Sequence, residues 1–144
     1  MKRTNTLLLS GIIIFFLCTF GLAPALAAGV LTYNEARHIV ECIDSLRWAD
    51  QIVVFDSYSD DGTVELAQQA GATIGQTKFE NYAQQRNAAL ATVEAEWILF
   101  IDADERSSPA QAAEIRAKIA SSQHNGYCIP RHNYIFGKLT RHTG

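Results

Sequence analysis

The sequence of 144 residues has little of what marks several common protein classes. It has only three cysteines, Cys18, Cys42 and Cys128, with no CxxC pair, so it indicates neither a disulfide framework nor a cysteine-rich zinc site. We interpret the three thiols as small buried apolar groups. Basic residues are not in excess, because 12 Lys and Arg stand against 15 Asp and Glu. We therefore do not expect nucleic acid to be a partner.

Several motifs of phosphate chemistry are missing as well. The chain has no G-x-x-x-x-G-K-[ST], which excludes a P-loop, and no G-x-G-x-x-G, so a dinucleotide-binding site is unsupported. The segment Asp61-Gly62-Thr63 has Ser59 where an aspartyl-nucleophile phosphatase would carry its nucleophile. With 48% apolar and 19% charged residues, the composition is that of one globular domain.

The first 27 residues have the pattern of a secretory signal peptide. Lys2 and Arg3 precede an apolar run over residues 7–23, and Ala25-Leu26-Ala27 has the form of a cleavage site. The run is also long enough for an uncleaved membrane helix. We divide the chain into residues 1–27, a signal-peptide-like or membrane-anchor segment, and residues 28–144, a folded domain. Taken alone, the N-terminal segment predicts export.

Beyond residue 30, strand and helix patterns alternate. Apolar runs rich in β-branched residues predict strands, over residues 52–55, 72–74 and 97–101, with further candidates at 126–130 and 133–136. Helical spacing predicts helices over residues 35–46, 63–70, 81–93 and 109–121, the first capped by Asn34 and the last by Ser107 or Ser108. This alternation predicts an α/β domain with a mostly parallel, Rossmann-like sheet flanked by helices. In such a sheet, ligands bind at the carboxyl ends of the strands.

One acidic segment follows the predicted strand at 52–55. A carboxylate at the end of a buried strand needs hydrogen-bond donors or a cation. Asp56 would suit the N–H of a base or the hydroxyls of a ribose. The neighbouring Ser59, Asp60 and Asp61 have a simpler interpretation, as turn and helix-cap residues.

A second acidic segment, Asp102-Ala103-Asp104-Glu105, follows the predicted strand at 97–101. Asp102 and Asp104 are two positions apart, so in extended backbone they point the same way. Converging carboxylates fit a hard divalent cation such as Mg²⁺ or Mn²⁺, which also takes phosphate oxygens. The alternative is a loop stabilised only by helix-cap contacts.

Two further segments are predicted at the same sheet edge. Arg86 lies on the helix before the acidic strand, where its guanidinium can bind a diphosphate if it faces the strand ends, or else remain in solvent. A further strand, the first of the chain, is predicted to end in the segment that contains Thr32, Tyr33, Asn34 and Glu35, which places hydroxyl, phenol and amide groups at this edge. These four residues can equally serve only to end that strand and begin the next helix.

In this order, these segments resemble the family 2 glycosyltransferases with the GT-A fold, and in particular the subgroup that adds glucose to the lipopolysaccharide inner core. The matching segments run from about residue 30 to 144. They are Leu31-Thr32-Tyr33-Asn34-Glu35, Trp48-Ala49-Asp50, Val54-Phe55-Asp56-Ser57-Tyr58-Ser59, Asp61-Gly62-Thr63, Gln85-Arg86-Asn87, Asp102-Ala103-Asp104-Glu105, Pro130-Arg131-His132-Asn133 and Gly137-Lys138.

The resemblance implies transfer of a hexose, with inversion, from a UDP-sugar to an acceptor hydroxyl on a glycan or glycolipid. It also implies a Mn²⁺ or Mg²⁺ ion that offsets charge on the leaving diphosphate. The nucleotide-binding residues that it implies are Thr32, Tyr33, Asn34, Glu35, Asp56, Arg86 and Asp102. Asp102 and Asp104 are the implied metal ligands, whereas Glu105 is placed behind them and not as a base.

In the family, the acidic base and the acceptor-binding half lie beyond the last matching motif, so we expect only the nucleotide-binding half here and assign no catalytic base. Two alternatives stay open: a non-catalytic nucleotide-binding remnant, and a Mg²⁺-dependent nucleotidyl- or phosphotransferase. Nucleotide sugars are cytosolic in bacteria, which predicts the cytoplasmic face of the inner membrane and conflicts with the export signal.

Overall fold

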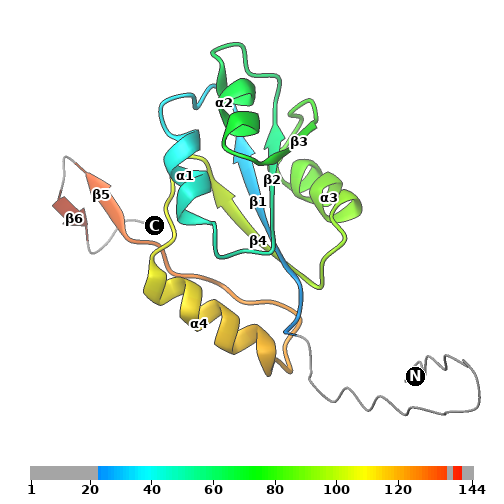
Figure 1. Ribbon diagram of the computed structural model, residues 1–144, viewed down its shortest axis with the longest axis vertical. Coiled ribbons are helices and arrows are strands. Elements are labelled where there is room, and N and C mark those ends of the chain that lie inside the picture. The colour runs from blue at the N-terminus through cyan, green and yellow to red at the C-terminus, as the bar shows by residue number, and fades with distance from the viewer. Residues whose placement is uncertain (1–22, 136–137, 141–144) are drawn as a thin grey trace, which may run out of the picture.

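The computed structural model describes residues 23–135 and 138–140. Its main sheet contains four parallel strands in the order β3-β2-β1-β4. They are β1 (Leu26–Thr32), β2 (Gln51–Asp56), β3 (Thr73–Gln76) and β4 (Trp97–Asp102). Figure 1 shows helices around this sheet. The predicted α/β class with a parallel sheet is confirmed.

Four helices connect and follow the strands: α1 (Ile39–Ser45), α2 (Thr63–Gln69), α3 (Tyr82–Thr92) and α4 (Pro109–Ala120). As predicted, α4 begins at a proline behind the cap Ser108, whose Oγ accepts from the Gln111 N–H at 3.1 Å. Asn81 caps α3 in the same way. A short antiparallel hairpin, β5 (Asn133–Ile135) and β6 (Lys138–Thr140), lies apart from the sheet (Figure 1).

The central strand β1 is buried along its whole length. Gly29 lets the neighbouring side chains come close, because a Cβ there would lie 3.2 Å from Ile98 Cδ1 and 3.4 Å from Phe100 Cδ1. Leu26 and Ala27, which end the leader-like segment, are part of this strand. Among the described residues no helix is long and apolar enough to cross a membrane. Residues 1–22 lie outside the description.

Alternate residues of the strands pack on the two faces of the sheet, as the period of a strand requires. Val30, Val54 and Ile101 face α1 and α2 in one core cluster. Leu31, Phe55 and other side chains form a second cluster with Ala89 of α3. The fold is therefore a layered α/β arrangement with apolar packing on both sheet faces.

Three predictions about local structure were wrong. Asn34 does not cap the first helix; it lies at φ 54°, and its Oδ1 accepts from the Asp60 N–H, while a turn at Glu35 delays the helix to Ile39. Residues 126–130 form no strand, because no neighbouring strand supplies hydrogen bonds to their exposed backbone. Cys128 is exposed in that segment, whereas Cys42 is buried as predicted.

Candidate functional site

The carboxyl edge of the sheet brings together polar residues from three strands. Thr32 pairs with Asp56 across β1 and β2, and Leu31 pairs with Asp102 across β1 and β4. These side chains are far apart in the sequence, but the parallel register aligns the ends of their strands. The edge is where an open α/β sheet binds its ligand.

Thr32 presents an unused hydrogen-bonding group at this edge. The residue is 5% exposed, and within the described part of the chain its buried Oγ1 has no hydrogen-bond partner. A buried hydroxyl without a partner is costly, so a ligand polar group would satisfy it. The adjacent Tyr33 is 61% exposed and offers an open aromatic face.

Asp56 is fully buried and already bound by its own chain. Its Oδ2 accepts from the Ser59 N–H at 2.9 Å and from Gln76 Nε2 at 3.2 Å, and its Oδ1 accepts from the Ser59 hydroxyl. In this conformation the carboxylate therefore holds the loop after β2. Direct contact with a ligand requires that this loop shift.

The loops after β1 and β2 are joined by hydrogen bonds. The Asn34 N–H donates to Ser59 Oγ at 2.8 Å, and the Glu35 N–H donates to Thr63 Oγ1 at 2.9 Å. Asp61 accepts from the Ala36 N–H at 3.0 Å, in agreement with its interpretation as a turn residue. The hydrogen bond from the Thr63 hydroxyl, and then that from the Ala36 N–H, lower the pKa of Asp61. Asn34 and Glu35 thus shape the rim of the site through their backbone.

Arg86 lies against the acidic strand end. Its guanidinium carbon is 5.8 Å from the ring centres of both Tyr82 and Phe100, which places it on aromatic faces. Its charge acts on Asp102, where it opposes the rise in that residue's pKa. The helix α3 therefore presents this guanidinium toward the strand ends, one of the two arrangements that the sequence left open.

The acidic turn after β4 brings the carboxylates of Asp102, Asp104 and Glu105 together. Burial raises the pKa of Asp102, and the charges of Glu105 and Asp104 raise it further. Asp104 is exposed at the tip of the turn. Glu105 Oε2 accepts from the Asp102 N–H at 3.1 Å, so it braces the turn, in keeping with its predicted place behind the aspartates.

The turn suits a metal that completes its coordination with other ligands. Among residues 23–135 and 138–140 no group of three or more His, Cys, Asp or Glu side chains is arranged to hold an ion. Mg²⁺-type ions are commonly bound through one or two carboxylates, with water and phosphate supplying the remaining ligands. Burial and the neighbouring carboxylates Glu105 and Asp104 raise the pKa of Asp102, and a bound cation would favour its charged form. Asp102 and Asp104 therefore fit such an ion.

Sequence reasoning gave no nucleotide- or metal-binding role to several residues that build the site. Ser59 and Gln76 hold Asp56. Gln85 is buried, and its Nε2 donates to Ser57 Oγ at 2.9 Å, which fixes α3 to the end of β2. Arg131 pairs with Glu105. Gln85 and Arg131 lie in segments that match the family, but the residues that they contact are distant in the sequence and no local pattern reveals them.

Comparison with known proteins assigns the family. The model of the family "Glycosyl transferase family 2" matches residues 28–144. A glycosyltransferase of Rickettsia felis is 36% identical over 103 residues, 71% of this chain and 36% of that protein. The lipopolysaccharide core biosynthesis glycosyltransferase LpsC of Rhizobium meliloti is 34% identical over 118 residues, 78% of this chain and 44% of that protein. The chain belongs to glycosyltransferase family 2 and spans about a third to a half of the length of these relatives.

Solved structures share the fold. Mannosyl-3-phosphoglycerate synthase of Rubrobacter xylanophilus matches with a TM-score of 0.61 and 23% identity, over 69% of this chain and 37% of its own. Glucosyl-3-phosphoglycerate synthase of Mycobacterium tuberculosis, in complex with Mn²⁺, UDP and glucosyl-3-phosphoglycerate, matches with a TM-score of 0.59 and 20% identity, over 69% of this chain and 41% of its own. The GT-A architecture expected for this chain is thereby confirmed.

Proposed function

We propose that this protein binds a nucleotide sugar, a UDP-hexose, at the carboxyl edge of its sheet and takes part in hexose transfer to an acceptor hydroxyl. The observation that carries the proposal is the meeting of Thr32, Asp56 and Asp102 at that edge, with Arg86 beside them. Membership of family 2 supports glycosyl transfer as the reaction class. The Mn²⁺ and UDP named for the mycobacterial neighbour support the donor and the ion.

In the proposed complex, the base lies beside Thr32 and Tyr33. The unpartnered Thr32 hydroxyl supplies a hydrogen bond and the exposed Tyr33 ring supplies a stacking face. Asp56 binds the base N–H only after the Ser59 loop moves, since its carboxylate is buried. Asn34 and Glu35 hold the rim of this site through their backbone N–H groups.

The diphosphate lies between Arg86 and the acidic turn. Asp104 and Asp102 hold Mn²⁺ or Mg²⁺, Asp102 being shared with the ribose side. When bound, the ion supplies Lewis-acid stabilisation of the leaving diphosphate. Arg86 orients the phosphates, because a guanidinium binds phosphate oxygens in a fixed fork. No described residue is assigned as the base for the acceptor hydroxyl.

We further propose that the acceptor is a glycan or glycolipid of lipopolysaccharide synthesis. The similarity to LpsC supports this choice. Because nucleotide sugars are made in the cytosol, the site would face the cytoplasm, with the apolar run over residues 7–23 as an anchor in place of a cleaved signal. A chain extracted from membranes only by detergent, with its N-terminus intact, would agree with this arrangement; recovery of the protein from the periplasm would contradict it.

The test of the site is calorimetric titration of UDP into the chain, with Mn²⁺ and with a chelator. We expect binding that needs the ion and that falls about tenfold or more in Asp104→Asn, which loses a ligand to the ion. Asp44→Asn is the matched control, an exposed aspartate on α1 that pairs with Arg47. Equal UDP affinity with and without the ion, or in Asp104→Asn, would overturn the metal role.

A transfer assay separates the proposal from its alternatives. UDP-glucose is supplied with a lipopolysaccharide core acceptor, and both UDP release and acceptor mass are followed. Hexose transfer by the chain supports the enzyme. Metal-dependent UDP binding without transfer favours a nucleotide-binding module, and turnover of a nucleotide that carries no sugar favours a nucleotidyl- or phosphotransferase.

A further inference from the structure

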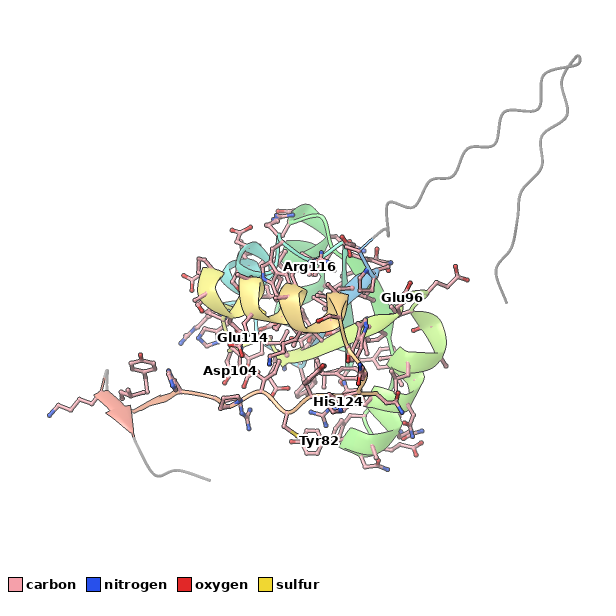
Figure 2. The ribbon with its side chains drawn as sticks, turned by 90° about the horizontal axis from the view of Figure 1, so that it is seen from below. Tyr82, Glu96, Asp104, Glu114, Arg116 and His124 are labelled. Atoms are coloured by element: carbon pink, nitrogen blue, oxygen red, sulfur yellow. The ribbon has the colours of Figure 1, made fainter. Side chains whose placement is uncertain are left out.

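Arg131 lies across the acidic turn, although it comes from the segment between α4 and β5. Its Nη1 is 2.6 Å from Glu105 Oε1 and 3.7 Å from Asp102 Oδ2. In Figure 2 this segment leaves the end of α4 and passes the labelled Asp104. A positive charge from the chain itself is therefore held beside the carboxylates proposed to bind the metal.

Glu105 fixes the place of this guanidinium. One of its carboxylate oxygens accepts from the Asp102 N–H at 3.1 Å, and the other accepts from Arg131 at 2.6 Å. Glu105 is thus a bridge between the backbone of the turn and the arginine. Because a guanidinium stays charged at all physiological pH values, Arg131 is a permanent cation at this position.

The ion pairs of Arg131 with Glu105 and Asp102 can be broken at little cost in free energy. The Arg131 side chain is 65% exposed and that of Glu105 is 27% exposed. Ion pairs this exposed to solvent contribute little to the stability of the folded protein, so the arginine can leave its partners at little cost. A diphosphate, by contrast, offers a guanidinium two or more charged oxygens and a bidentate geometry.

We propose that Arg131 is the internal counter-ion of the acidic turn, and that it exchanges Asp102 and Glu105 for the diphosphate when the metal-bound nucleotide arrives. The first half concerns the free protein, while the second rests on the proposed nucleotide site. Arg131 then competes with the divalent ion in the absence of nucleotide and supports binding in its presence. It is a positioning residue that changes partners.

The test measures two affinities in the whole chain, wild type and Arg131→Gln. Mn²⁺ binding without nucleotide is followed by electron paramagnetic resonance, and UDP binding at saturating Mn²⁺ by calorimetry. We expect Arg131→Gln to bind Mn²⁺ about two- to fivefold more tightly, because a competing cation is gone. We expect it to bind UDP about tenfold more weakly, through loss of a charged hydrogen bond. Uridine, which has no phosphate, should bind both forms equally.

Arg47→Gln is the matched control, because Arg47, just after α1, also forms an exposed ion pair, with Asp44 of that helix at 3.1 Å. It should change neither affinity. Opposite changes in the two affinities support the exchange; no change, or a fall in both, overturns it. If the wild type binds no UDP, the proposed function fails, while the Mn²⁺ measurement still tests the counter-ion. Thermal unfolding of each variant checks that the fold is retained.

Discussion

Arg116 on α4 binds Asp50 with both arms of its guanidinium, at 2.9 Å from each carboxylate oxygen. The same guanidinium donates to the Trp48 carbonyl at 2.8 Å, and Asp50 accepts from the Leu26 N–H at 2.8 Å. Figure 2 shows Arg116 on the helix that lies along the domain. This one contact therefore ties α4 and the loop before β2 to the start of the central strand.

Replacing Arg116 by glutamine should destabilise the domain. The variant loses two charge-assisted hydrogen bonds and one to a carbonyl, but Asp50 is half exposed, so we expect a loss of about 1–2 kcal/mol in the free energy of unfolding. Urea denaturation measures it. Lys118→Gln, in the last turn of the same helix, is the control and should be nearly neutral. Equal stability of the two variants would show that the contact contributes nothing.

The stabilisation by Asp50 should disappear in acid. The hydrogen bond from Arg116 and that from the Leu26 N–H lower the pKa of Asp50. A carboxylate whose pKa is lowered in the folded state stabilises the protein at pH values above the pKa that it has in the unfolded chain, about 3.9. This stabilisation is lost as the pH falls through the pKa of the folded state. Asp50→Asn should therefore be less stable than wild type at pH 7, with the difference narrowing below about pH 4. A difference that is constant from pH 7 to pH 3 would contradict the linkage.

Leu26 should behave as a core residue despite its place in the leader-like segment. It is 2% exposed in β1, so Leu26→Ala should lower the free energy of unfolding by about 2–5 kcal/mol. Leu90→Ala, at a leucine 55% exposed on α3, is the control and should cost far less. Denaturant unfolding of both compares them. A similar small effect at both sites would mean that Leu26 is not part of the folded strand.

Ser59 should affect nucleotide binding without contacting the reacting atoms. Its hydroxyl donates to Asp56 and accepts from the Asn34 N–H, so Ser59→Ala frees two loops at the proposed binding site of the base. We expect UDP affinity to fall about three- to tenfold, the equivalent of one or two ordinary hydrogen bonds. Ser121→Ala, at an exposed serine after α4, is the control for the titration. Unchanged affinity in Ser59→Ala would show that this loop plays no part.

Cys42 should resist alkylation while Cys128 reacts. Burial raises the pKa of the Cys42 thiol to about 12, so its reactive thiolate is scarce at neutral pH, and the side chain is also inaccessible. Cys128 is exposed. Of the two cysteines in the described residues, iodoacetamide at pH 8 followed by peptide mass spectrometry should find the label on Cys128 and not on Cys42, and on both of these two in urea. Labelling of Cys42 in the native protein at a similar rate would contradict the buried assignment.

Most elements of the fold were predictable because their signals are local. The apolar run before Asp56 and that before Asp102 each became a buried parallel strand, and Pro109 with Ser108 marked the start of a helix. The failures occurred where the outcome depended on distant partners, either because one was present, as at Asn34, or because none was, as at residues 126–130. Asn34 is a residue type that commonly caps helices, but its side-chain oxygen accepts from the Asp60 N–H instead. The backbone then turns before the helix begins at Ile39.

By itself, the sequence determined which residues lie at the ligand edge of the sheet. Polar groups placed directly after buried strands must come together there, because parallel strands end on one side. Only the tertiary structure decided which of these groups are free. Asp56 is covered by Ser59 and Gln76, the Thr32 hydroxyl has no partner among the described residues, and Arg131 reaches the acidic turn. The reason is physical: strand order follows from local hydrophobic patterns, whereas hydrogen bonds and ion pairs depend on loops that meet only in three dimensions.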